Sequence, residues 1–151
     1  MSEPFDDTLG RAIISRLLVS IYNIKPENII ESKGECWYDL AFSDETHKYA
    51  VEVKQRHFDS TAFPTHLINE EKFRSAENAI NNKQFGYAYL ASIWQDGVIW
   101  INDMYDEDRN LECHWQNKTT QTGRSTDGVK ERKRCIAYEP KDIYYVAMQY
   151  I

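Results

Sequence analysis

Two short runs decide the fold of this chain: Cys36–Phe42, with the sequence CWYDLAF, and Lys48–Lys54, with the sequence KYAVEVK. In each run apolar residues alternate with the others, which is the period-two pattern of a half-buried β-strand. If the residues between them turn the chain, the runs pair as a hairpin with Asp39 opposite Glu52 and Lys54 one pleat along on the same face. The other face of the hairpin is apolar. Two carboxylates and an ammonium group would therefore meet on one face, where they suit a hard divalent cation and a phosphodiester.

This hairpin resembles the PD-(D/E)XK nuclease superfamily, in which an acidic residue on one strand is followed by (D/E)-x-K on the next. Asp39 and Glu52-Val53-Lys54 match that signature, and Tyr38 stands where many members carry a proline. The resemblance covers about residues 1–102, whereas residues 103–151 match only loosely. It implies a restriction-endonuclease-like α/β fold, a mixed β-sheet flanked by α-helices. The run VEVKQR at 51–56, followed by FPT at 63–65, is also similar to small phage-encoded nucleases of this superfamily.

The context of the motif matters more than its letters, because E-x-K occurs three times in the chain. The other two copies begin at Glu70, at an expected helix start, and at Glu131, in a cluster of charges. Only the copy at Glu52 lies in an alternating strand with an acidic residue opposite. The alternative interpretation is an exposed strand face that carries an ordinary Glu/Lys pair.

The resemblance assigns roles to these residues. It implies Mg²⁺ or Mn²⁺ held by Asp39, Glu52 and the backbone carbonyl of Val53, with Lys54 beside the attacking water. It also implies a further catalytic lysine or glutamine on the next helix, where Lys72 stands. An acidic residue of the first helix joins the site in many relatives, and Asp6 and Asp7 are the candidates, but helix capping is the favoured interpretation of these residues. The implied activity is metal-dependent endonucleolytic hydrolysis of DNA, and RNA stays open as a substrate.

The charge distribution bears on nucleic-acid binding. The net charge is −6, yet residues 119–151 carry six basic residues against four acidic ones. Such a stretch binds phosphates on an acidic molecule, although a solvated charged surface is an equal alternative. Arg56 continues the Glu52 and Lys54 face by strand parity. The predicted nucleic-acid contacts are Arg56, Lys130, Arg132, Lys133 and Arg134.

Composition predicts one globular domain over residues 1–151. The hydrophobic fraction of 42%, the ten Tyr and the few Gly and Pro are typical of a packed core. No apolar run approaches membrane-spanning length, and the N-terminus has no signal-peptide pattern, so no membrane contact is expected. The three cysteines stand at irregular spacing, which favours buried free thiols in a reducing cytoplasm over a zinc site.

Periodicity predicts the remaining elements. A helix capped by Asp6 or Asp7 ends before Pro26, and a second helix runs from the cap Asn69 to about Asn82. Strands are expected at 85–93 and 98–102, joined by a turn at 95–97, and again at 133–138. Residues 56–67 and 105–128 are predicted to be irregular, with the histidines of the loops exposed to solvent. The apolar segment 142–151 is expected to dock on the domain.

Two other functions stay open. The chain could be a nuclease-fold module that binds nucleic acid or protein without catalysis, such as a phage accessory or antirestriction factor. It could also be a subunit that cuts only as a homodimer or inside a larger assembly. No nucleophile elbow, glycine-rich phosphate loop or HExxH zinc motif supports another catalytic scheme.

Overall fold

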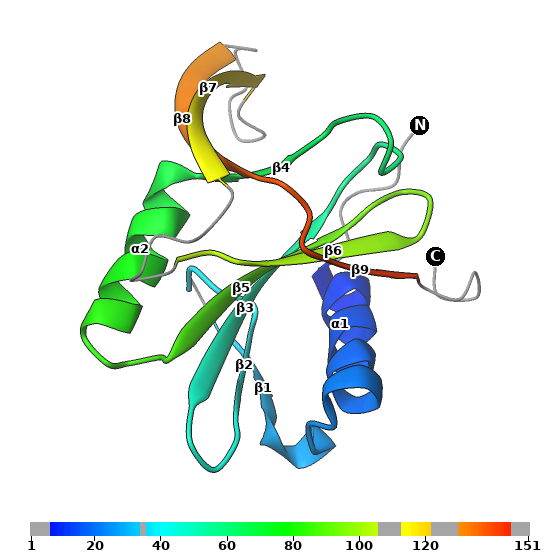
Figure 1. The fold of residues 1–151 in the computed structure, drawn as a ribbon, viewed down its shortest axis with the longest axis vertical. Helices are drawn as coiled ribbons and strands as arrows, with labels where there is room; N and C mark the ends of the chain where they lie inside the picture. Colours follow the sequence, from blue (N-terminus) through cyan, green and yellow to red (C-terminus); the bar gives the residue numbers. More distant parts are fainter. Residues whose placement is uncertain (1–6, 34–35, 106–112, 122–129, 146–151) are drawn as a thin grey trace.

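A six-stranded mixed sheet forms the centre of the structure, a computed structural model that describes residues 7–33, 36–105, 113–121 and 130–145 (Figure 1). In 113–121 and 130–133 the backbone alone is described. The strand order is β1-β2-β3-β5-β6-β9, with β3 and β5 parallel and the other neighbours antiparallel. The strands span Ile29–Glu31 (β1), Leu40–Ser43 (β2), Lys48–Gln55 (β3), Tyr87–Ile93 (β5), Val98–Asp103 (β6) and Asp142–Tyr145 (β9).

Two helices, α1 (Asp7–Tyr22) and α2 (Glu70–Asn81), cover opposite faces of this sheet (Figure 1). Ile14 of α1 packs in one core with Val53 of β3, and Phe73 of α2 packs in a second core with Leu90 of β5. Because successive residues of a strand face opposite sides, Glu52 lies on the side of α2. The predicted α/β class, a mixed sheet flanked by helices, is confirmed.

The connections agree with the predicted turns and caps. The side chain of Asn69 accepts a hydrogen bond from the backbone N–H of Lys72, which makes it the N-cap of α2. Between β5 and β6, Gly97 adopts a φ of 86°, in the left-handed region that favours glycine. A short 3₁₀ turn, η1 (Pro26–Asn28), follows α1, which ends at Tyr22. The predicted docking of the C-terminal segment is confirmed for β9, and residues 146–151 lie outside the described residues.

A second sheet corrects the prediction for the C-terminal third. It is antiparallel in the order β4-β8-β7, with β4 at His66–Asn69, β7 at Cys113–Gln121 and β8 at Lys130–Tyr138. The expectation of irregular chain was therefore wrong for β7 and for the start of β4, and β8 begins earlier than predicted. Backbone pairing supplies these strands with hydrogen bonds that their polar composition did not reveal.

Individual side chains bring further corrections. His66, predicted to face solvent, is only 1% exposed and lies between the two sheets. Cys135 is buried as expected, whereas Cys36 is exposed. Neither helix in the described part of the chain is long and apolar enough to cross a membrane.

Candidate active site

The hairpin of β2 and β3 has the register that the sequence predicts. Leu40 pairs with Val51, and the backbone N–H of Asp39 donates to the carbonyl of Val51 at 2.8 Å. Asp39 thus stands opposite Glu52, one residue before the first residue of β2. Alternation fixes which face of the hairpin is buried and the length of the turn selects the register, which brings the two acidic residues to the same place.

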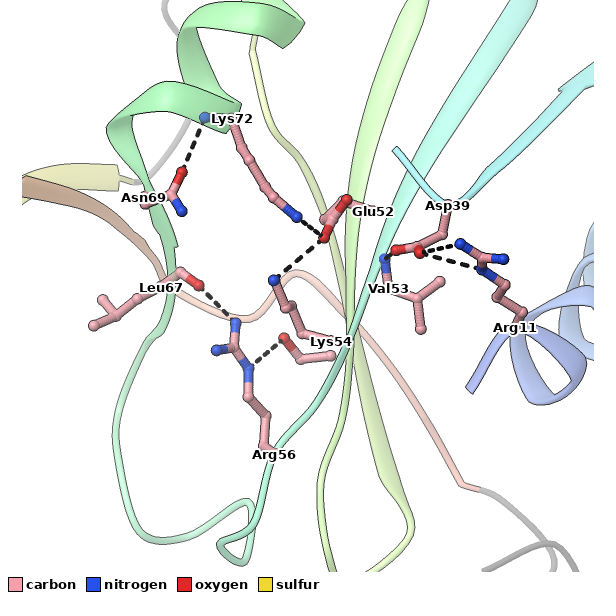
Figure 2. A network of polar contacts seen from close by, with 10 residues as sticks. Arg11, Asp39, Glu52, Val53, Lys54, Arg56, Leu67, Asn69 and Lys72 are labelled. Carbon is pink, nitrogen blue, oxygen red and sulfur yellow. Dashed lines mark hydrogen bonds and ion pairs between the residues drawn. The ribbon is translucent and has the colours of Figure 1, made fainter. Parts of the chain in front are cut away.

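Glu52 is a buried carboxylate, 3% exposed, between two ammonium groups (Figure 2). Its Oε1 accepts a hydrogen bond from Lys72 Nζ and lies 3.3 Å from Lys54 Nζ. Burial raises the pKa of Glu52, the positive charges of the two lysines oppose that rise, and the negative charge of Asp39 adds to it. Burial, together with the charge of Lys72, lowers the pKa of Lys54. Perturbed titratable groups gathered in this way are typical of functional sites.

Asp39 is held from two sides. Its Oδ2 accepts the backbone N–H of Val53 at 2.8 Å, and its Oδ1 accepts Arg11 of α1 through Nε at 3.2 Å and Nη2 at 3.0 Å (Figure 2). Just before the start of β2, the Asp39 carboxylate therefore replaces a backbone carbonyl as the acceptor for the N–H of Val53. Arg11 was not predicted, and the only sequence signal is its place on the first helix, where an acidic residue was expected. Asp7 begins α1, and Asp6 lies outside the described residues.

The main chain of Val53 offers one further oxygen. In a β-strand the N–H and C=O of one residue point the same way. Since the N–H of Val53 points to Asp39, its carbonyl points to the same edge of β3, past the first residue of β2. Two carboxylates and a carbonyl are hard oxygen donors of the kind Mg²⁺ takes while keeping several waters. Among the described residues no cluster of three or more His, Cys, Asp or Glu suits a metal, so this donor set is a small one.

Lys72 comes to the site from the first turn of α2. The cap bond from Asn69 fixes the start of the helix, and the lysine side chain then reaches across to Glu52 (Figure 2). The structure thus brings together all the residues for which the sequence predicted catalysis or metal binding: Asp39, Glu52, Val53, Lys54 and Lys72. Their roles remain predictions.

Arg56 lies beside this cluster but donates inward. Its Nε donates to Ser92 Oγ at 3.2 Å and its Nη2 to the carbonyl of Leu67 at 2.6 Å (Figure 2). Burial lowers its pKa to about 10. The contact of Arg56 with a phosphate remains a prediction. Because Nε and Nη2 donate to Ser92 and Leu67, Nη1 is the nitrogen that would make this contact.

Arg56 starts a buried chain of hydrogen bonds that sequence reasoning missed. His66 Nδ1 lies 2.7 Å from Ser92 Oγ, His66 Nε2 lies 2.7 Å from Asn102 Oδ1, and Asn102 Nδ2 donates to the carbonyl of Glu139. Since Asn102 Nδ2 donates to that carbonyl, its Oδ1 accepts from His66 Nε2. Burial lowers the pKa of His66 to about 4, so the ring is neutral at pH 7 and its Nδ1 accepts the hydroxyl of Ser92. Ser92 and Asn102, polar residues inside two apolar strand runs, were the available signal.

The predicted basic stretch lies in β8. Lys130, Arg132 and Lys133 are placed by their backbone, and their side chains lie outside the described residues. Arg134 is exposed and donates to Glu70 Oε2 of α2 at 3.2 Å.

Two cavities lie near this part of the fold, and neither is lined by Asp39, Glu52 or Lys54. A cavity of about 750 Å³ runs along α1 and contains none of the predicted catalytic residues. Another, of about 520 Å³, begins at Gln55 and Arg56, directly after Lys54 along the chain. The second cavity therefore lies closer along the chain to Lys54 and is the better candidate for a binding site.

No protein-family model and no curated protein sequence matches the chain. Among solved structures, the chain is similar to Hjc, a Holliday junction resolvase from the archaeal hyperthermophile Archaeoglobus fulgidus. The match has a TM-score of 0.44 and 15% identity, and it covers 63% of this chain and 72% of that chain.

Proposed function

We propose that the protein is a metal-dependent nuclease that hydrolyses phosphodiester bonds of DNA. One observation carries the proposal: the buried carboxylate of Glu52 stands opposite Asp39 on neighbouring strands, with Lys54 Nζ 3.3 Å from Glu52. Asp39, Glu52 and the carbonyl of Val53 are the groups that would hold Mg²⁺ or Mn²⁺. When bound, such an ion lowers the pKa of a coordinated water and offsets charge on the phosphate.

The protein side chains supply the remaining functions. Lys54 offers an ammonium group to the phosphate oxygens, where negative charge develops in the transition state. Its lowered pKa brings proton exchange closer to neutral pH. Lys72 holds Glu52 in place through an ion pair. Arg11 offsets the negative charge of Asp39 in the metal-free protein.

A binding module without catalysis is the second candidate, and one observation favours it. Asp39 and Glu52 already have ion-pair partners in Arg11, Lys54 and Lys72, so the network is neutralised without any metal. A purely structural network of this kind would bind no ion. A third candidate, a subunit active only as a homodimer or in an assembly, would bind the ion but would not cut alone.

The test is incubation of the isolated chain with supercoiled, linear and branched DNA, and with RNA, in Mg²⁺ or Mn²⁺. Lys54→Ala should lower turnover by about 10²-fold or more and leave DNA binding nearly unchanged, because Lys54 acts on the transition state. Lys48→Ala, an exposed lysine at the other end of β3, is the matched control and should cut normally. If the wild type binds no Mn²⁺ and cuts no DNA or RNA, and Lys54→Ala binds nucleic acid as before, the binding module is the better conclusion.

A further inference from the structure

The cavity of about 520 Å³ opens where the chain leaves β3, beneath the loop of residues 56–65. Its size is that of a pocket for a small organic group. Two phenylalanines line it and are largely exposed, Phe58 at 57% and Phe63 at 49%. Their rings meet edge to face with centroids 5.4 Å apart. An exposed aromatic pair beside a cavity contributes little to the core and is typical of a binding surface.

Backbone hydrogen bonds hold this loop in shape. The N–H of Arg56 donates to Ile93 at 2.8 Å, and the N–H of Gln95 donates to the carbonyl of Phe58 at 2.9 Å. Asp96 accepts both the N–H and the hydroxyl of Ser60, at 3.2 and 2.8 Å. The loop is thus fastened to the turn between β5 and β6, so a ligand entering the cavity has little chain to order.

The cavity lies next to the candidate active site. Lys54 precedes the first lining residues, Gln55 and Arg56, and two residues of a strand span about 7 Å. Along the axis of a duplex that length equals about two base-pair steps, and an unstacked strand covers it in fewer nucleotides. A strand with its phosphate at Lys54 would therefore bring a nearby base to the mouth of the cavity.

We propose that this cavity takes up one unpaired base of the DNA, stacked on Phe58 or Phe63, an inference that rests on the nuclease function proposed above. Stacking on an aromatic face suits every base, and Thr65 is a polar residue of the same lining. A base inside a duplex is stacked on both faces and must first be extruded, whereas an unpaired base enters at low cost. The substrate class is therefore DNA with an unpaired nucleotide, such as a bulge, a gap or a branch.

The test compares the affinity of the full chain for two duplexes with one extra nucleotide in EDTA, where nothing is cut. In one duplex the extra nucleotide carries its base, and in the other it is abasic, so phosphate charge and backbone are the same. The wild type should bind the base-bearing bulge about ten-fold more tightly. Phe58→Leu combined with Phe63→Leu keeps an apolar lining but removes both rings, and it should bring the ratio close to one.

Controls keep the result specific. Tyr145→Leu removes a tyrosine that is 80% exposed on β9 and is not in the lining, so it should leave the ratio unchanged. The single variant Phe58→Leu, at the more exposed ring, gives a second measurement if the double variant melts early.

The outcomes separate this inference from the nuclease proposal. Equal affinity of the wild type for both bulges overturns the base pocket, even if the enzyme cuts DNA. A ratio that survives the double leucine variant also overturns it, because the base is then recognised outside this cavity. A ten-fold ratio that is lost with the rings, in a protein that cuts nothing in Mg²⁺ or Mn²⁺, supports the pocket while refuting catalysis.

Discussion

Glu52 is a carboxylate that the fold has removed from water and placed opposite a second carboxylate, that of Asp39. Burial and this neighbour both disfavour its charged form. A divalent cation shared by the two carboxylates would relieve their repulsion in the native state alone. We therefore expect millimolar Mn²⁺ to raise the melting temperature by about 5 °C or more, the shift that ligand at 100 times its Kd gives a domain of this size. Asp39→Asn should abolish most of that rise.

The control for this measurement is Asp59→Asn, which removes an exposed acidic residue of the 56–65 loop and should keep the full rise. Melting is followed by circular dichroism in EDTA and in Mn²⁺. Identical curves for the wild type in the two buffers would falsify the metal site.

His66 provides a test that is independent of metal. Its pKa is lowered to about 4 by burial, against 6.5 for the free side chain, so the unfolded chain binds a proton between these pH values and the native chain does not. Stability should therefore fall as the pH drops from about 6.5 to 4, by up to about 3 kcal/mol from this group. His66→Gln removes the titrating group, so urea denaturation across this range should show a flatter curve for the variant. The exposed His57→Gln should leave the wild-type pH dependence in place.

Among the elements, α2 links stability to the site through its first turn. Asn69 caps the helix on the N–H of Lys72, whose side chain reaches Glu52. Asn69→Ala should lower the free energy of unfolding by about 1 kcal/mol, because the first turn loses its acceptor. Urea midpoints measure this change, and Asn69→Asp, which keeps an acceptor, should restore most of the loss. An alanine variant as stable as the wild type would mean that packing alone fixes the turn.

The elements also show where sequence patterns suffice. The hairpin register was predictable because a slip by one residue would expose Leu40 and Val51, and the length of the turn selects among the remaining registers. The strand β7 was not, because Cys113–Gln121 has no such alternation and its pairing with β8 depends on backbone bonds. Such an edge strand forms because its partner strand offers backbone hydrogen bonds, and the periodicity of its own sequence does not predict it.

Over the whole molecule, the side-chain contacts that sequence reasoning missed join distant parts of the chain. Arg11 meets Asp39 across 28 positions, and His66 meets Asn102 across 36. Burial of a histidine or neutralisation of a carboxylate is a tertiary property, so the residue types alone indicated only that such groups existed. Lys72, by contrast, was placed at the site by the family resemblance, and the cap at Asn69 fixes its position in the first turn of α2.

The overall charge of −6 makes the location of basic residues decisive for DNA binding. If Lys130, Arg132 and Lys133 contact phosphates, replacing all three by alanine should weaken binding to any DNA sequence. The slope of log affinity against log salt concentration should also become shallower, by roughly 0.9 for each lost phosphate contact. The matched control replaces the exposed Lys25, Lys33 and Lys83 by alanine, which changes the net charge equally. Affinity is measured by fluorescence anisotropy between low and physiological salt. Equal slopes for the two triple variants would show that net charge, rather than the strand β8, governs binding.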